Sequence, residues 1–199
     1  TSITYPEGER VDYLYNSAGQ ISQVNKVKTG VTTVLTSNVT YSPLGQITHV
    51  ERGNGVITDY TYDVNQNYRL TRIYSAKGTS ILQDIAYTYD TNGNILTLVD
   101  TSTTQLAKNV AYTYDDLNRL TSTTVTGSGS GTNYTQTFTY DAIGNMLTNS
   151  DVGTYAYTLN NPHQARTMGS TTYTYDNNGN VSFNNSDPMV YDWRDRMNY

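Results

Sequence analysis

The sequence contains no cysteine, which excludes disulfide cross-links, a cysteine-ligated zinc site and a thiol nucleophile. Histidine is almost as scarce: the chain has 2, His49 and His163, and no cysteine can share a metal ion with them. Phenylalanine (2 residues) and tryptophan (1 residue) are also rare, whereas tyrosine occurs 20 times. Tyrosine must therefore supply most of the aromatic surface that the folded chain buries.

Charge and long apolar runs are limited as well. Charged residues make up 15% of the 199 residues, and the formal net charge is −5. A mildly acidic chain does not attract nucleic acid or anionic membranes, so we expect neither as a partner. No run approaches the roughly 18 apolar residues of a membrane-spanning helix, so we expect no membrane insertion. The many aromatic residues and the low net charge argue against intrinsic disorder.

One phrase recurs along the chain: an aromatic residue, any residue, tyrosine, and then a turn-forming residue. It occurs as YTYDTNGNIL (87–96), YTYDDLNRL (112–120), FTYDAIGNML (138–147) and YTYDNNGNV (173–181). Nine copies, of which Val39/Tyr41 and Met189/Tyr191 are degenerate, give a mean spacing of about 22 residues. The anchor residues are Tyr13, Tyr15, Tyr41, Tyr60, Tyr62, Tyr87, Tyr89, Tyr112, Tyr114, Phe138, Tyr140, Tyr155, Tyr157, Tyr173, Tyr175 and Tyr191.

The residues that follow each anchor pair predict a tight turn. In the pattern Asp-x-x-Gly, aspartate suits the first position of a type I turn and glycine suits the fourth. Asn118 stands where most copies have glycine, and asparagine tolerates a positive φ better than most residues. The predicted turn residues are Gly19, Gly45, Gly93, Asn118, Gly144 and Gly179.

Each copy therefore predicts a β-hairpin. Tyr-x-Tyr places two rings on one face of a strand, because side chains alternate along a strand. Residues 95–99 and 120–125 are rich in β-branched types and predict return strands, and residues 127–131 (GSGSG) predict a flexible loop. Nine hairpins amount to about 18 strands, and no helical period of useful length is present. We predict an all-β fold in which repetitive antiparallel β-hairpins form a long, coiling sheet.

The motif Tyr-x-Tyr-Asp-x-x-Gly-Asn, followed by a hydrophobic residue and iterated in this way, resembles the YD repeat of RHS-repeat proteins. Residues 112–122 and 62–73 resemble its Arg-Leu variant, and residues 161–165 (NPHQA) are similar to a Pro-His element found late in such arrays. The resemblance covers essentially the whole chain. We therefore expect residues 1–199 to be a single array of about nine repeats and a fragment of a longer protein.

The resemblance implies a large β-shell of the bacterial toxin-shell or wall-associated type; animal teneurins are a poorer match because no cysteine-rich segment accompanies the array. In this family a strip of YD strands forms a hollow container, which in toxins can enclose a C-terminal effector. It implies a secreted or cell-surface protein whose partners are the rest of the parent protein and an enclosed effector. Some members cleave themselves at an Asp-Pro signature, but Asp187-Pro188 lacks the Gly-Arg that precedes it, so self-cleavage is not carried over.

Candidate chemistry is sparse in the loops themselves. Calcium takes roughly six to eight oxygen ligands, whereas each loop offers one carboxylate, apart from the adjacent pair Asp115 and Asp116. No nucleophile-elbow phrase marks a hydrolytic serine. We therefore expect no catalytic residue, no metal and no cofactor.

Two hypotheses for function follow from these observations. The main one is a non-catalytic structural segment of an RHS/YD-repeat shell or extracellular scaffold, which in the parent protein encloses or presents a C-terminal effector. The alternative is a carbohydrate- or cell-surface-binding repeat module that uses exposed tyrosine faces. Under either hypothesis, unpaired strand edges favour self-association of the isolated array.

Overall fold

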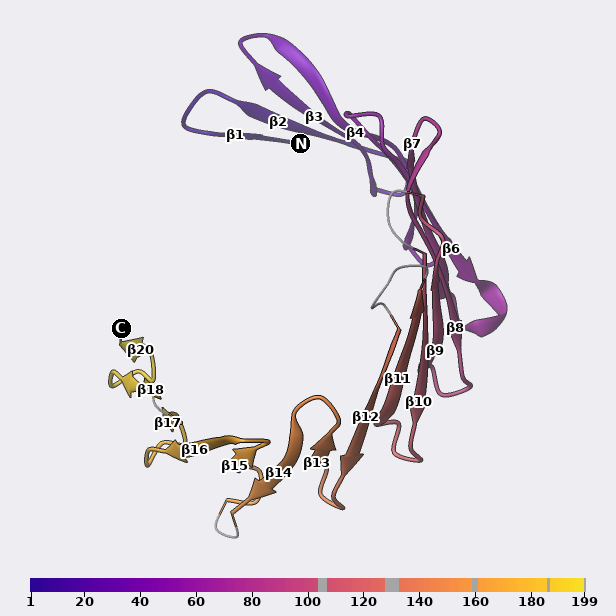
Figure 1. The fold of residues 1–199 in the computed structure, drawn as a ribbon. Helices are drawn as coiled ribbons and strands as arrows, with labels where there is room; N and C mark the ends of the chain where they lie inside the picture. The colour runs from indigo at the N-terminus through magenta and orange to yellow at the C-terminus, as the bar shows by residue number, and fades with distance from the viewer. Residues whose placement is uncertain (104–106, 128–132, 159–160, 186, 199) are drawn as a thin grey trace. The chain divides into compact units, whose positions relative to one another are not determined.

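A computed structural model describes residues 1–103, 107–127, 133–158, 161–185 and 187–198. Within these residues the chain forms twenty strands joined by short turns, with one 3-10 helix, η1 (Val64–Gln66), between two of the strands (Figure 1). The predicted all-β class is therefore confirmed. Most of the glycine- and serine-rich loop expected at residues 127–131 lies outside the described residues.

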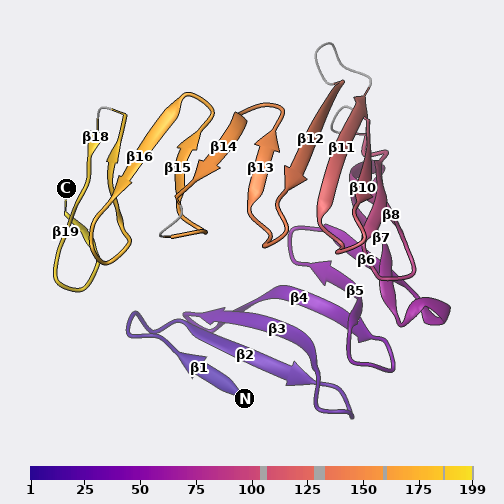
Figure 2. The same ribbon diagram turned by 90° about the horizontal axis from the view of Figure 1, so that it is seen from below.

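Eighteen strands belong to one sheet, and β19 (Val190–Tyr191) pairs with β20 (Met197–Asn198) in a separate two-stranded ladder. In the described registers, each strand pairs antiparallel with the strand next to it in the sequence. Figure 2 shows the consequence, since successive strands lie side by side in chain order. The sheet is therefore built from consecutive antiparallel hairpins, as predicted.

The contacts divide the chain into two compact units, and both are built from the same repeat. The first unit comprises Thr1–Ala111 and Val125–Asn133. Its strands are β1 (Ser2–Thr4), β2 (Arg10–Tyr15), β3 (Ile21–Lys28), β4 (Val31–Tyr41), β5 (Ile47–Arg52), β6 (Ile57–Asp63), β7 (Arg69–Lys77), β8 (Ser80–Tyr89), β9 (Ile95–Asp100) and the first part of β10 (Lys108–Tyr114).

The second unit comprises Tyr112–Thr124 and Tyr134–Tyr199. It contains the end of β10, most of β11 and the shorter strands that follow. These are β11 (Leu120–Gly127), β12 (Tyr134–Tyr140), β13 (Met146–Asn149), β14 (Gly153–Tyr157), β15 (Ala165–Met168), β16 (Thr171–Tyr175), β17 (Val181–Asn184) and β18 (Asp187–Pro188), followed by β19 and β20.

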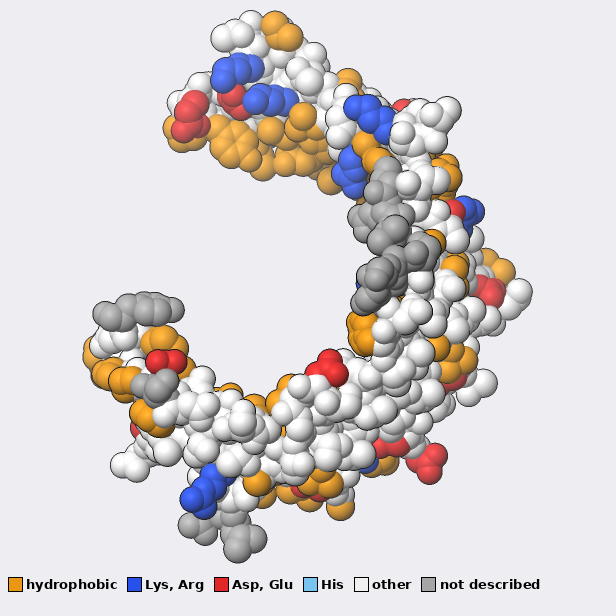
Figure 3. All heavy atoms as spheres, in the orientation of Figure 1, with side chains coloured by type: hydrophobic (Ala, Val, Ile, Leu, Met, Phe, Trp, Pro, Cys, Tyr) orange, Lys and Arg blue, Asp and Glu red, His pale blue; other side chains and the backbone are white. Residues whose placement is uncertain are grey.

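Burial alternates along the anchor strands. In β8, Tyr87 and Tyr89 are half-buried while Thr88 between them is exposed, and the same pattern recurs in β10, β12, β14 and β16. Figure 3 shows hydrophobic side chains gathered on one face of β1–β4. The most deeply buried apolar residues are small, namely Val39, Val50, Ala76, Val110, Val125 and Ala165, and no large side chain among the described residues falls below 2% exposure.

Close backbone approach explains one glycine that does not sit at a predicted turn position. Gly53 follows β5, and its N–H donates to the carbonyl of Leu35 in β4 at 2.9 Å. A β-carbon at this position would lie 1.9 Å from the carbonyl oxygen of Val34, closer than any van der Waals contact allows. Gly53 does not have a left-handed backbone conformation, so conformational freedom does not explain why glycine is needed here. The reason is the lack of space for a β-carbon.

We predict that Gly53→Ala lowers the free energy of unfolding by about 2 kcal/mol or more, because overpacking must push apart β4 and the turn after β5. Gly78→Ala is the matched control: Gly78 has φ +57° and no atom within 4 Å of the added β-carbon, so its cost of about 1 kcal/mol comes from backbone strain alone. Urea denaturation compares the two. Equal midpoints for the two variants would contradict the steric explanation.

Candidate functional site

The most regular feature of the chain is the five-residue loop that follows seven of the nine second anchors. In the loop at residues 90–94, the N–H of Gly93 donates to the carbonyl of Asp90 at 3.2 Å, and the N–H of Asp90 donates to the carbonyl of Asn94 at 3.0 Å. The fourth residue is left-handed, as in hairpin loops that combine a turn with a bulge. These left-handed residues are Gly19 (φ 77°), Gly45 (80°), Gly93 (100°), Asn118 (60°), Gly144 (95°), Gly179 (89°) and Asp195 (56°).

The side chain of the first loop residue closes the loop from inside. Oδ1 of Asp141 accepts hydrogen bonds from the N–H groups of Ile143 at 3.0 Å and Asn145 at 2.9 Å, while Oδ2 accepts from Nδ2 of Asn145 at 2.8 Å. The loops that begin at Asp90, Asp115, Asp176 and Asp192 repeat this arrangement with small variations. Each carboxylate therefore supports its own loop, which is a structural use of the acid.

Hydrogen bonding lowers the pKa of these carboxyl groups. For Asp90 the largest cause is the side-chain hydrogen bond from Asn94, and for Asp115 it is the hydrogen bond from the backbone N–H of Arg119. Both groups are consequently ionised at neutral pH and already engaged by donors of their own loop. Asn16 closes its loop in the same way with an uncharged side chain. Its Oδ1 accepts a hydrogen bond from the N–H of Gln20 at 2.9 Å, and its Nδ2 donates to Oε1 of Gln20 at 3.0 Å.

In six repeats the second anchor links its repeat to the preceding one. Tyr140 donates its hydroxyl to the carbonyl of Leu120, the first residue of the preceding return strand, at 2.8 Å. The same bond recurs in both units and always ends on the first residue after the preceding loop. The other pairs are Tyr41 to Ile21 (2.7 Å), Tyr62 to Ile47 (3.0 Å), Tyr89 to Leu70 (2.5 Å), Tyr157 to Met146 (2.9 Å) and Tyr175 to Ala165 (2.6 Å).

A second set of bonds runs in the opposite direction along the chain, from one loop to the next. The residue after the left-handed position supplies the donor: Nη1 of Arg69 bonds the carbonyl of Asp90 at 2.7 Å, and Nη1 of Arg119 bonds that of Asp141 at 2.9 Å. The Arg119 guanidinium also lies 4.8 Å from the ring centroid of Tyr140, a cation–π distance. The Arg-Leu variant therefore joins a loop to both the turn and the tyrosine of the next repeat.

The remaining anchors are placed differently. The first-anchor residues lie on the same face as the second anchors, and Phe138 occupies this position without any hydroxyl. Tyr15 is 46% exposed, more than any other anchor. Tyr191 donates to the sulfur of Met189 at 3.9 Å. On the opposite face, exposed threonine hydroxyls pair across the hairpins, for example Thr139 with Thr148 at 2.6 Å.

Two loops depart from the five-residue pattern. After Tyr62, residues 63–69 form a longer loop that contains η1, with Asn67 and Tyr68 both left-handed at φ 55°. After Tyr157, the N–H of Gln164 donates to the carbonyl of Asn161 at 2.9 Å, and His163 Nδ1 lies 2.8 Å from Oδ1 of Asn145 in the preceding loop. The Pro-His element thus occupies the place of a turn.

Two further turns of the five-residue kind lie outside the anchor motif. The N–H of Gly8 donates to the carbonyl of Tyr5 at 2.9 Å, and the N–H of Gly55 donates to that of Arg52 at 2.8 Å. The motif search did not find these turns, because no anchor pair precedes them. A glycine three residues after the first loop residue, as in Tyr5 to Gly8 and Arg52 to Gly55, was the available signal.

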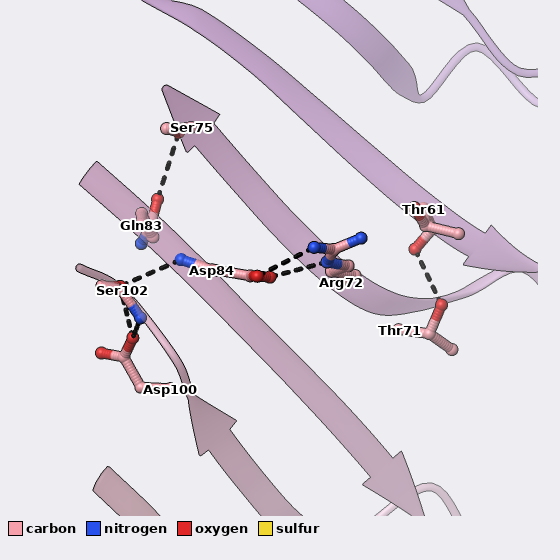
Figure 4. A network of polar contacts seen from close by, with 8 residues as sticks. All are labelled: Thr61, Thr71, Arg72, Ser75, Gln83, Asp84, Asp100 and Ser102. Atoms are coloured by element: carbon pink, nitrogen blue, oxygen red, sulfur yellow. Dashed lines mark hydrogen bonds and ion pairs between the residues drawn. The ribbon is translucent and has the colours of Figure 1, made fainter. Parts of the chain in front are cut away.

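A polar network connects β7, β8 and the end of β9 in the first unit (Figure 4). Arg72 holds Asp84 in a two-point contact of 2.6 and 2.8 Å, and this hydrogen bonding lowers the pKa of Asp84. Buried Ser102 donates to Oδ1 of Asp100 and accepts from the N–H of Asp84 at 3.0 Å. This is the nearest approach to a Ser–acid arrangement, but the dashed contacts of Figure 4 include no histidine.

His49 lies in a different part of the first unit. Its Nδ1 is 2.5 Å from Oδ1 of Asp59 on β6, and its Nε2 is 3.7 Å from Oε1 of Glu51 on β5. The hydrogen bond with Asp59 is the largest cause that raises the pKa of His49. Among the described residues, no group of three acidic, histidine or cysteine side chains is placed to hold a metal ion. No helix of the described residues is long and apolar enough to cross a membrane.

We predict that Tyr140→Phe lowers the free energy of unfolding by about 1 kcal/mol, because it leaves the Leu120 carbonyl without its donor while keeping the ring. Tyr112→Phe is the control and is expected to cost less than about 0.5 kcal/mol, because its hydroxyl has no hydrogen-bond partner in the described part of the chain. Chemical denaturation of both variants measures the difference. Equal losses would show that the hydroxyl bond does not join the repeats.

We also predict a pH-dependent contribution from His49. Because its pKa is raised in the folded state, the protonated side chain stabilises the fold below its ordinary pKa of 6.5, and this stability is lost as the pH rises through the folded pKa. The Asp59 side chain is 44% exposed, so the effect is small, under about 1 kcal/mol. Wild type, His49→Gln and Asp59→Asn are compared by urea denaturation at acidic and alkaline pH. A wild-type advantage that persists unchanged at alkaline pH would contradict this assignment.

Comparison with known proteins gives one kind of match. No protein-family model matches the chain, and no curated protein matches it significantly. Solved structures do match. In the crystal structure of TcdB2-TccC3-Cdc42, a chain that is 25% identical superposes with a TM-score of 0.70, and the match covers 98% of this chain.

Two further structures agree in fold. A crystal structure of TcdB2-TccC3 has 19% identity and a TM-score of 0.54, and a structure of the Photorhabdus luminescens Tc holotoxin pore has 20% identity and a TM-score of 0.53; each covers 91% of this chain. The chain spans only 11% of the first matched chain, 12% of the second and 11% of the third. These Tc toxin structures share the fold of this chain over nearly its whole length, and its repeated YD motif is similar to that of RHS-repeat proteins.

Proposed function

We propose that the chain is a non-catalytic structural segment of an RHS/YD-repeat shell or extracellular scaffold. The observation that carries the proposal is the series of tyrosine hydroxyl–carbonyl bonds, which joins one hairpin to the preceding one in both units. Such neighbour-to-neighbour bonding suits a wall that is extended by adding repeats. The loop carboxylates support the same interpretation, since each one accepts donors from its own loop.

The matched structures support a role within a larger protein. They are described as TcdB2-TccC3 complexes and as a Tc holotoxin pore, and this chain spans about a tenth of each matched chain. By analogy, the partners of this segment are the other parts of its parent protein, including an enclosed or presented C-terminal effector. The same analogy favours a bacterial parent that is secreted or displayed at the cell surface.

The alternative, a module that binds carbohydrates or cell surfaces through exposed tyrosine faces, has less support. Most anchors are half-buried, and six second-anchor hydroxyls already donate to backbone carbonyls. A second-anchor hydroxyl that already donates to a backbone carbonyl is not free to donate to a ligand. The tyrosine ladder is better explained as the joint between repeats.

The proposal predicts that, in the parent protein, the sequence that follows this array resists trypsin until the array unfolds. Gly53→Ala in the parent should lower the temperature at which the downstream segment is cut, whereas Tyr112→Phe should leave it unchanged. Digestion monitored by mass spectrometry over a temperature series measures both. Cleavage of the downstream segment while the array remains folded would contradict enclosure. Turnover of a hydrolase substrate by the purified chain, lost on Ser102→Ala, would contradict the non-catalytic assignment.

A further inference from the structure

The loop after Tyr62 contains residues that hairpin closure does not need. Seven anchor loops close β-hairpins with five residues, whereas residues 63–69 include the additional turn of η1. Asn67 and Tyr68 are both held at φ 55°, a conformation that asparagine tolerates but that is costly for a bulky residue such as Tyr68. The loop is therefore larger and more strained than its structural task requires.

This loop forms one wall of a pocket of 330 Å³ within the first unit, and the loop at residues 90–94 forms the other. The volume lies near the lower end of the about 300–1,000 Å³ that small-molecule sites occupy. Its lining is polar and includes one aromatic ring. The side chains that matter for recognition are those of Asn65, Gln66, Asn67, Arg69, Tyr89 and Thr91.

Three consecutive amides in the lining are unused by the fold. The side chains of Asn65, Gln66 and Asn67 make no hydrogen bond within the described residues; the N–H of Asn65, by contrast, donates to Oδ1 of Asp63. In the regular loops the corresponding amides are engaged, as Asn145 Nδ2 is with Oδ2 of Asp141. Each amide offers both a donor and an acceptor, so the three together match a ligand with several adjacent hydroxyl groups.

The two charged groups that line the pocket, Arg69 and Asp90, carry opposite charges, and both are held by hydrogen bonds within the fold. Arg69 donates from Nη1 to the carbonyl of Asp90 at 2.7 Å and from Nη2 to that of Thr91 at 3.3 Å, and its guanidinium lies 5.7 Å from the centroid of the Tyr89 ring. The Asp90 carboxylate accepts from Asn94 and from the N–H of Gly93. The lining therefore has no net charge, which does not favour a phosphate or a metal ion and suits a neutral ligand.

We propose that this pocket binds a neutral saccharide. The amides of Asn65, Gln66 and Asn67 bond its hydroxyl groups, and the apolar face of a sugar ring packs beside Tyr89. The site differs from the repeated tyrosine faces because its amides are supplied by the enlarged loop. The inference stands on the pocket alone and does not depend on the structural role proposed above.

The test uses the 199-residue chain, labelled with ¹⁵N, and a panel of neutral oligosaccharides: maltohexaose, cellohexaose, laminarihexaose and chitohexaose. We expect at least one of them to produce saturable shifts in the side-chain NH₂ signals of Asn65, Gln66 and Asn67. Gln66→Ala and Asn67→Gly should each weaken binding about tenfold, because losing a hydrogen bond worth about 1.4 kcal/mol lowers the affinity tenfold. Asn67→Gly retains the left-handed backbone, so its fold should remain intact.

Asn177→Ala is the matched control, since it removes an exposed loop amide outside the pocket and should leave binding unchanged. Thermal melting of each variant confirms that the chain is folded. The proposal is overturned if no member of the panel gives saturable shifts, or if binding survives both pocket variants. It is also overturned if inorganic phosphate or a tetraalanine peptide shifts the same signals more strongly than every sugar.

Discussion

One hydrogen bond joins neighbouring hairpins of this chain to each other. In it, a second-anchor tyrosine donates its hydroxyl to the carbonyl of the first residue after the preceding loop. A hairpin alone is marginally stable in water, and its own ladder does not determine where the next hairpin lies. Tyr140, bonded to Leu120, joins two hairpins through a ring that is half-buried between them. Each bond is worth only about 1 kcal/mol, so stability depends on repeating the bond along the chain.

This constraint explains why the repeat uses its polar residues as it does. A carboxylate such as Asp141 is committed to three donors of its own loop, and a guanidinium such as Arg119 is committed to the next loop and its tyrosine ring. Side chains with these duties are not available to a ligand. New chemistry can therefore enter the array only where the repeat is interrupted, and the enlarged loop of residues 63–69 is such a place.

Short-range features were predictable from sequence because their causes lie within five residues. The positive φ of Asn118 follows from the turn that its neighbours require, and the shared face of Tyr112 and Tyr114 follows from strand alternation. The turn at Gly55 escaped prediction because no anchor pair marks it, although its backbone bond to Arg52 is of the same kind. The enlarged loop escaped because Asp63 begins it with the same residue that begins a regular loop.

The sequence by itself determined the repeat, the positions of most hairpin turns and the all-β class, because each depends on local backbone preference. Only the tertiary structure decided which distant groups meet. Three contacts show this, each between residues about 20 positions apart. The hydroxyl of Tyr89 donates to the carbonyl of Leu70, and the side chain of Arg69 donates to the carbonyl of Asp90. Gly53 lies so close to the carbonyl of Val34 that a β-carbon would not fit. Such distances are set by how neighbouring hairpins stack, and a periodic motif carries no information about the reach of a side chain between them.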